Sequence, residues 1–168
     1  MKYLGLWLVV AAGIGLGRYY SRRLYRRAER LQQLVLLLQT LQQQLTYTAL
    51  PLSALWRRLA AGEAFRTLPL LQATAEALAA GQPFRAAYAA GMESLAGDGL
   101  TPADRQLLLE FGEGCGVTGL SEQAAHIAAY RGLLQQAQQQ AQQQAQQQGR
   151  VYQALGAAGG IALALLLL

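Results

Sequence analysis

The chain has 168 residues, of which 53% are hydrophobic and only 14% are charged. Alanine, leucine and glutamine dominate it, a composition that favours helix over strand and predicts an all-α fold. The net charge of +5 comes from arginines near the N-terminus, because residues 31–149 carry six arginines and eight acids. A nucleic-acid binder would carry its basic surface on the folded domain, so this distribution argues against nucleic acid as a ligand.

A charge-free apolar segment, residues 3–17, comes first in the chain. With the tyrosines at 19 and 20 at the interface, it predicts a transmembrane helix over residues 3–20. We expect an anchor and not a cleaved signal peptide, because the positive charges follow the apolar core. These charges predict a cytoplasmic basic cluster that attracts anionic lipid head groups. The cluster consists of Arg18, Arg22, Arg23, Arg26, Arg27 and Arg30.

Residues 21–134 are predicted to form a cytoplasmic bundle of six helices. In the first helix, leucines spaced by three, four and seven residues form one stripe, and we expect this helix to continue from the membrane span. The stripe consists of Leu24, Leu31, Leu34, Leu38, Leu41 and Leu45. Prolines and capping residues predict four further helices, over 51–59, 68–80, 83–92 and 101–111, and a sixth from Ser121. Gly97-Asp98-Gly99 predicts a turn.

Residues 135–150 form a glutamine-rich segment with three Ala-Gln-Gln-Gln units, and we predict a helical stalk there. An alanine at every fourth position gives no wide apolar face, which favours a solvated stalk. The other interpretation is a glutamine-rich seam that pairs with another copy or with a partner. The charge-free residues 151–168 then predict a second transmembrane helix, so that both termini lie outside and the bundle lies in the cytoplasm.

Each predicted span contains two glycines four residues apart, which would give it a small-residue face for packing in lipid. These candidate packing residues are Gly13, Gly17, Gly156 and Gly160. The alternative is that glycine and alanine are simply common in this chain.

The chain lacks a convincing catalytic or cofactor motif. Residues 114–119 match G-x-G-x-x-G, but a helix precedes them and glutamines follow where a dinucleotide site needs an acid, so we expect a helix connection with glycines at positive φ. His126 and Cys115 are each the only residue of their type, without activating or metal-ligating neighbours in sequence. Glu110 and Glu113 favour a solvated or docking face over acid–base chemistry. We therefore expect no enzyme activity, no metal and no cofactor.

Two stretches of the sequence resemble a known family. Tyr47 with Pro51-Leu52-Ser53 resembles the Tyr…Pro-Leu-Ser stretch of stage III sporulation protein AB of endospore-forming bacteria. Phe111-Gly112-Glu113 with Gly116, followed by Gln123, His126 and Ile127, resembles the family's Phe-Gly-Glu-x-x-Gly…Gln…Ile stretch. The layout of two terminal spans around a helical domain is similar as well. The chain departs from the family pattern at Cys115 and Gly119, where Leu and Asp are expected, and in its glutamine-rich stalk.

The resemblance implies a role in sporulation after engulfment, in a channel-like complex between mother cell and forespore. It implies a domain similar to that of the inner-membrane platform protein of type II secretion and type IV pilus machines. By that analogy, the chain would sit in the mother-cell membrane and dock a cytoplasmic ATPase, beside other membrane components of the complex. The candidate docking residues are Glu110, Phe111, Gly112, Glu113, Gly116 and Gln123.

A second function is consistent with the same residues. The chain could be a membrane-anchored scaffold that associates with copies of itself and has no ATPase partner. Its contacts would be the leucine stripe of residues 31–45 and the glutamine-rich stalk.

Overall fold

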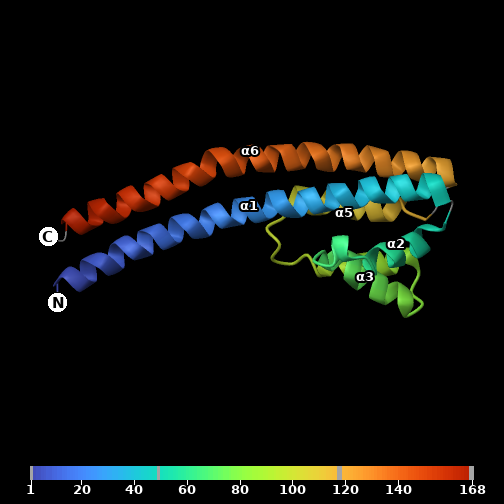
Figure 1. Cartoon of the computed structure of the whole chain (residues 1–168), viewed down its shortest axis with the longest axis horizontal. Helices are drawn as coiled ribbons and strands as arrows, with labels where there is room; N and C mark the ends of the chain where they lie inside the picture. Colours follow the sequence, from blue (N-terminus) through green and yellow to red (C-terminus); the bar gives the residue numbers. More distant parts are fainter. Residues whose placement is uncertain (1, 49, 117–118, 167–168) are drawn as a thin grey trace. The chain divides into compact units, whose positions relative to one another are not determined.

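Helices account for nearly all of the regular structure, and the predicted all-α class is confirmed. The computed structural model describes residues 2–48, 50–116 and 119–166, and side-chain surroundings chiefly for residues 19–148. The described residues form six α-helices and one short 3-10 helix, with no strand (Figure 1). The elements are α1 (Lys2–Thr48), α2 (Leu52–Ala60), η1 (Glu63–Phe65), α3 (Pro69–Ala79), α4 (Phe84–Glu93), α5 (Pro102–Gly114) and α6 (Leu120–Leu166).

The chain divides into two compact units. Glu29–Gln138 forms one of them, which we call the bundle unit, and Met1–Ala28 with Gln139–Leu168 forms the other, which we call the terminal unit. Helices α1 and α6 contribute to both, and each is an unbroken helix of 47 residues. The predicted continuity of the first helix is therefore confirmed. At a rise of about 1.5 Å per residue, each helix is about 70 Å long.

The predicted membrane spans are not shown by the structure. Among the described residues, no helix has both the length and the apolar character that crossing a membrane requires. The surroundings of Gly13, Gly17, Gly156 and Gly160 lie outside the described residues, so their predicted packing role stays a prediction.

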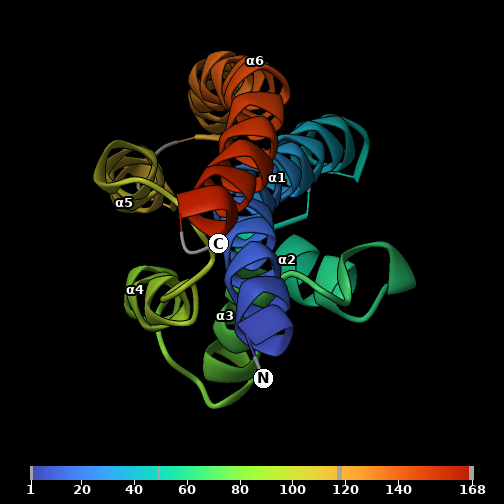
Figure 2. The ribbon, with the colours of Figure 1, turned by 90° about the vertical axis from the view of Figure 1, so that its left-hand side faces the viewer.

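The core of the bundle unit is built on the leucine stripe of α1. Five of the six predicted stripe positions are at most 3% exposed, and Leu37 joins them. The buried stripe consists of Leu31, Leu34, Leu37, Leu38, Leu41 and Leu45. Helices α2, α3, α4 and α5 follow one another as neighbours in the bundle (Figure 2). The stripe therefore supplies the interior of the chain's own bundle, and it is not free to pair with another copy.

Small residues bring α3 and α4 close together. A Cβ atom at Gly91 on α4 would lie 2.1 Å from Oγ1 of Thr74 and 3.0 Å from the carbonyl oxygen of Leu70. The Thr74 hydroxyl instead donates to that carbonyl, at 2.7 Å, which satisfies a buried polar group on α3. The two helices thus approach to a distance that only glycine at position 91 permits.

An ion pair joins α1 to two connecting segments of the bundle unit. Nε of Arg30 lies 2.9 Å from Oδ2 of Asp98, and Nη2 donates to Oδ1 at 3.2 Å. Nη1 of Arg30 also donates to the carbonyl oxygen of Thr67, at 2.9 Å. Asp98 stands in the predicted turn, where Gly97 and Gly99 have φ values of +89° and +80°. One guanidinium therefore connects α1, the segment before α3 and the turn before α5.

The terminal unit contains an alanine seam, formed by small buried residues on α1 and α6. Ser21 and Ala28 on α1 are 2% and 8% exposed, and Ala141 and Ala145 on α6 are 1% exposed. Beside this seam, Nη1 of Arg27 donates to Oε1 of Gln144 at 3.0 Å. The glutamine-rich segment is helical, with Ala141 and Ala145 buried and the glutamines at 139, 140, 142–144 and 146–148 exposed, so the solvated stalk and the glutamine seam with a partner both stay predictions. A narrow face of small side chains is sufficient for two helices to pack, because their backbones can come close to each other across it.

The predicted ends of α2, α3 and α4 agree with the structure to within one residue, and that of α5 does not. Helix α2 ends at Ala60, one residue after the predicted end at 59, with Ala61 as its C-cap. Helix α5 continues to Gly114, three residues beyond the predicted end at Phe111, because no residue before Cys115 interrupts it.

Candidate functional site

The predicted docking residues surround the junction between α5 and α6, which is set in place by a strong helix start. Thr101 and Asp104 form a capping box at the beginning of α5. The N–H of Asp104 donates to Oγ1 of Thr101 at 3.2 Å, and the N–H of Thr101 donates to Oδ2 of Asp104 at 2.9 Å. Pro102 occupies the first helical turn, where its missing N–H is not needed. The predicted cap at Thr101 is confirmed.

A continuous cluster of aromatic rings fixes the end of α5 against its neighbours. Phe111 stacks on His126 of α6, with ring centroids 5.6 Å apart and planes at 14°. The edge of Tyr88 on α4 meets Phe111 at 5.9 Å, and Tyr88 in turn meets Trp56 on α2 at 5.7 Å. Such edge-to-face and offset pairs add to the stabilisation that burial provides. The cluster therefore joins four helices through their largest side chains.

Glycines make room for these rings. A Cβ atom at Gly112 would lie 2.2 Å from Cδ1 of Tyr88, and one at Gly114 would lie 2.2 Å from Cε1 of His126. Real Cβ contacts do not approach so closely, since atoms in protein interiors are already packed as densely as in organic crystals. Gly112 of the Phe-Gly-Glu-x-x-Gly stretch, and Gly114 within it, thus have a packing role at this junction, whereas a Cβ atom at Gly116 would meet nothing within 4 Å.

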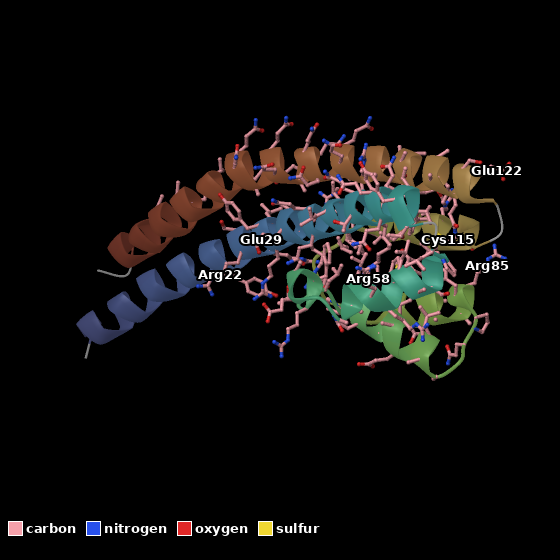
Figure 3. All side chains as sticks on the ribbon, turned by 45° about the vertical axis from the view of Figure 1, so that its right-hand side comes forward. Arg22, Glu29, Arg58, Arg85, Cys115 and Glu122 are labelled. Atoms are coloured by element: carbon pink, nitrogen blue, oxygen red, sulfur yellow. The ribbon has the colours of Figure 1, made fainter. Side chains whose placement is uncertain are left out.

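The last carbonyl groups of α5 are satisfied by residues from three other segments. Nε2 of His126 lies 3.0 Å from the carbonyl oxygen of Phe111, and because a carbonyl only accepts, this nitrogen carries the proton. Nε of Arg85 on α4 donates to the carbonyl oxygen of Glu113 at 3.0 Å, and the N–H of Cys115 donates to that of Gly112 at 3.3 Å. Figure 3 shows Arg85 and Cys115 at the same end of the bundle. A cation here also complements the negative end of the helix dipole.

Burial governs the chemistry of the two most enclosed titratable groups. Cys115 is fully buried, and desolvation raises the pKa of its thiol from 9.0 to about 12. Burial also raises the pKa of the Tyr88 phenol well above 10.0, with a smaller contribution from Cys115. Both groups are therefore neutral at physiological pH. A thiol with a raised pKa has little thiolate, which is the nucleophilic form.

The six candidate docking residues fall into two groups. Glu110, Glu113 and Gly116 are exposed, as a docking face requires. Phe111 and Gly112 are buried in the aromatic cluster, and Gln123 is only 6% exposed. The helix face that carries Phe111 and Gly112 packs inward on α4 and α6, so these two residues do not lie on the exposed surface and their docking role stays a prediction. Phe111 and Gly112 hold the buried face of α5 in place, and the exposed face of the same helix carries Glu110 and Glu113.

The connection after α5 agrees with the interpretation of the glycine motif as a helix connection. Gly114 ends α5, Gly116 has a φ of +83°, and the carbonyl oxygen of Gly119 accepts from the N–H of Gln123 at 2.9 Å. Positive φ is accessible to glycine without strain. Residues 117–118 lie outside the described residues. A helix, not a strand, precedes the motif, so the geometry of a dinucleotide site is not present in the described part.

A surface groove of about 480 Å³ opens beside this junction. It is formed by the starts of α2 and α4, the end of α3 and the start of α6. Its lining includes Ser53, Arg57, Gln82, Phe84, Gly116 and Gln123. Two of the candidate docking residues, Gly116 and Gln123, thus face a concave surface. Its volume lies within the range of about 300–1,000 Å³ that is typical of ligand sites.

The groove residues on α2, α3 and α4 were not predicted from the sequence. Arg57, for example, lies 66 positions before Gln123, and no periodic pattern connects two such positions. One signal was present. Pro51 and Pro83 precede α2 and α4, and a helix that starts on proline lacks a capping side chain at that position.

The arginines of the predicted basic cluster include exposed residues and residues that are engaged within the chain. Arg22, Arg23 and Arg26 are exposed on α1, as a lipid-facing role would require. Arg27 is partly buried and donates to Gln144, and Arg30 is engaged with Asp98 and Thr67. The surroundings of Arg18 lie outside the described residues. The charge of Arg30 is therefore already paired within the bundle unit, which argues against a lipid-facing role for this residue.

His126 and Cys115 hold structural positions at the junction. His126 is partly buried between Phe111 and Tyr130, with a ring-centroid distance of 4.7 Å to Tyr130. Across the described residues, no group of three or more histidine, cysteine or acidic side chains is arranged to hold a metal ion.

Comparison with known proteins identifies one family. The sequence profile described as stage III sporulation protein AB matches residues 2–168, which is nearly the entire chain. No curated protein and no solved structure matches the chain.

Proposed function

Because the chain belongs to the stage III sporulation protein AB family, we propose that it is a membrane platform component of a sporulation complex. In this proposal it is not an enzyme. Its two charge-free ends anchor it in the mother-cell membrane that faces the forespore, and its bundle unit lies in the cytoplasm. There it docks a cytoplasmic ATPase, beside other membrane components of a channel between the two cells.

The observation that carries the proposal is the family match over residues 2–168, together with the two long helices. Helices α1 and α6 each run without a break from the bundle unit into a terminal segment. A helix is a stiff connection, so displacement of its cytoplasmic part is transmitted along its axis. The arginines at 22, 23 and 26 are exposed on α1 and provide charges that favour anionic lipid.

The docking face in this proposal is the exposed edge of α5. Glu110 and Glu113 are three positions apart on that helix, so they share one side of it, and both are exposed. Nε2 of Gln106 donates to Oε1 of Glu110 at 2.9 Å, which holds one carboxylate along the helix surface. Phe111 fixes the helix rotation from the buried side. Two carboxylates on a rigid helix suit a basic surface on the partner.

The test is affinity capture of the full-length protein from membranes of sporulating cells, with mass spectrometry of the captured proteins. We expect a cytoplasmic ATPase and further membrane components of the complex. Charge reversal in Glu113→Lys should reduce ATPase recovery by about tenfold or more. The matched control is Glu76→Lys, which reverses an exposed charge on α3.

Two results would contradict the proposal. If the unmodified protein recovers no ATPase, the docking function is wrong. If the ATPase is recovered equally well by Glu113→Lys and Glu76→Lys, docking occurs on another surface. Recovery of only further copies of the chain would instead favour the self-associating scaffold. Of the two contacts expected for that function, the leucine stripe is buried within the chain's own bundle, which leaves the exposed glutamines of residues 139–148.

A further inference from the structure

The described polar side chains that line the groove between the starts of α2 and α4 are all hydrogen-bond donors, and none of them is acidic. Its polar lining consists of the hydroxyl of Ser53, the guanidinium of Arg57 and the amides of Gln82 and Gln123. All four can donate hydrogen bonds, and Arg57 adds a positive charge. Among the described residues that line the groove, none is acidic. The lining therefore favours an anionic group.

Two helix N-termini face the same groove. Pro51 and Pro83 are the N-cap residues of α2 and α4, and neither helix has a side chain that accepts from its first-turn N–H groups. Such N–H groups need an acceptor from outside the helix, and the positive end of the helix dipole favours an anion as that acceptor. Leu52 and Ser53 of α2 and Phe84 of α4 line the groove at these two starts.

The side chain of Gln123 supplies an independent observation at the same groove. This side chain lines the groove and is 94% buried, yet its Nε2 atom has no hydrogen-bond acceptor. Buried amide donors in folded proteins almost always have a partner, because an unsatisfied one costs about 1–3 kcal/mol. A carboxylate in the groove would provide the acceptor.

The remaining lining is apolar and the cavity is larger than one carboxylate group. Leu52, Leu78, Pro83 and Phe84 contribute the apolar surface, and the volume is about 480 Å³. Phe84 is held in place by Trp56, whose ring meets it edge-on at 5.4 Å. A preformed apolar wall beside a cluster of donors suits a short peptide that carries an acidic side chain next to apolar ones.

From these contacts we propose that the groove binds an acidic, partly apolar segment of a partner protein, with a carboxylate of that segment held by Arg57, Gln123 and the N-termini of α2 and α4. This proposal extends the docking function proposed above. It rests on that function in one respect, namely that the molecule bound in the groove is a protein. The groove and the acidic edge of α5 are separate surfaces of opposite charge, so one partner surface cannot use both in the same way.

The test uses the full chain in sporulating cells, with a diazirine-bearing amino acid at Gln82, an exposed residue of the groove lining. The matched probe position is Glu63, which is exposed in η1 and does not line the groove. After illumination, mass spectrometry identifies the peptide joined to each position. We expect position 82, and not position 63, to join a segment that contains Asp or Glu beside apolar residues.

Two charge reversals on α2 provide the matched comparison. Arg57→Glu changes a residue of the groove lining, and Arg58→Glu changes its exposed neighbour, which does not line the groove. Arg58 is labelled in Figure 3. Because both side chains are exposed, both variants should fold, which circular dichroism checks. We expect Arg57→Glu to reduce the crosslink at position 82 by about tenfold or more, and Arg58→Glu to leave it within about twofold.

The proposal is overturned if position 82 gives no more crosslink than position 63, if the joined segment contains no acid, or if Arg57→Glu and Arg58→Glu behave alike. These outcomes are distinguishable from failure of the proposed function. An acidic segment from a protein that is not an ATPase supports the groove and contradicts ATPase docking there. ATPase capture without a crosslink at position 82 contradicts the groove and leaves the docking function standing.

A synthetic peptide of the joined segment then measures the charge preference directly. It is titrated into the purified full-length protein beside a copy in which every Asp and Glu is replaced by Asn and Gln. We expect the acidic peptide to bind about tenfold more tightly or better, since hydrogen bonds to a charged acceptor are the stronger ones. Equal affinity of the two peptides would overturn the proposal.

Discussion

The interior of the bundle unit and that of the terminal unit are packed in different ways. In the bundle unit, the rings of Tyr88 and His126 fit against Gly112 and Gly114 of α5. In the terminal unit, the alanine seam of Ser21, Ala28, Ala141 and Ala145 is made of small side chains alone. A shape-matched core is sensitive to any change of volume, whereas a seam between two helices can open locally. The same chain should therefore respond very differently to substitution in its two units.

The largest effect is expected at the centre of the aromatic cluster. Phe111→Ala should lower the free energy of unfolding by about 3–5 kcal/mol, because it removes a fully buried ring and leaves a cavity. It also removes the stacking partner of His126. Urea unfolding of the purified protein, followed by circular dichroism, measures this change. Tyr47→Ala is the control, since that ring is 87% exposed and its loss should change stability by no more than about 0.5 kcal/mol.

A smaller effect of the same kind is expected from adding one methyl group. Gly112→Ala should destabilise by about 1–3 kcal/mol, because the new Cβ would collide with the ring of Tyr88. Gly132→Ala on α6 is the opposite case. Nothing lies within 4 Å of its Cβ position, so replacing a helical glycine there should stabilise by about 0.5–1 kcal/mol. Thermal melts of the two variants should move in opposite directions, and parallel shifts would contradict the shape-matched core.

The bundle unit should also weaken at high pH. In the folded state, the pKa of Cys115 is raised from 9.0 to about 12, so stability is complete below pH 9 and decreases as the pH rises through this window. By pH 10 the loss should be about 1 kcal/mol, and Tyr88 adds to it at still higher pH. Urea unfolding at pH 8, 9 and 10 measures the slope. In Cys115→Ala the slope should flatten, and an unchanged slope would assign the decrease to other groups.

The smallest effect is expected in the terminal unit. Ala145→Gln places a larger side chain in the alanine seam, and we expect it to cost about 1 kcal/mol, at the low end of the range for overpacking. Hydrogen exchange should accelerate in residues 21–28 and 139–148 and stay unchanged in α5. The exposed neighbour Gln146, replaced by alanine, is the control. Equal acceleration of hydrogen exchange in α5 would contradict a local opening of the alanine seam.

Local sequence patterns predict most of the helices and the buried face of α1, but not which face of α5 is buried. The leucine spacing in α1, the cap at Thr101 and the Gly97–Gly99 turn each depend on neighbouring residues, and all three are confirmed. The exposure of Phe111 depends on how α5 is rotated against α4 and α6, which no local pattern specifies. Likewise, the partner of Arg30 lies 68 positions away. An arginine inside a basic run gives no signal that it faces inward.

The alanine repeat shows why a weak pattern can still be decisive. One small residue in every four forms too narrow a stripe to count as an amphipathic helix, and the segment was therefore predicted to be solvated. Ala141 and Ala145 are nevertheless buried, because Ser21 and Ala28 on α1 are also small. Which face is buried is decided by the pair of helices together, and the sequence of either helix alone does not contain that information.

The contacts of Arg30 have a consequence for how this chain can vary. Its guanidinium serves Asp98 and the Thr67 carbonyl together, so substitutions at positions 30 and 98 should not be additive. Loss of Asp98 alone would leave a partly buried cation, and restoring fitness would then require a change at a site 68 residues distant. Among relatives of this chain, the two positions should change together, and this covariation would be readable from sequences alone.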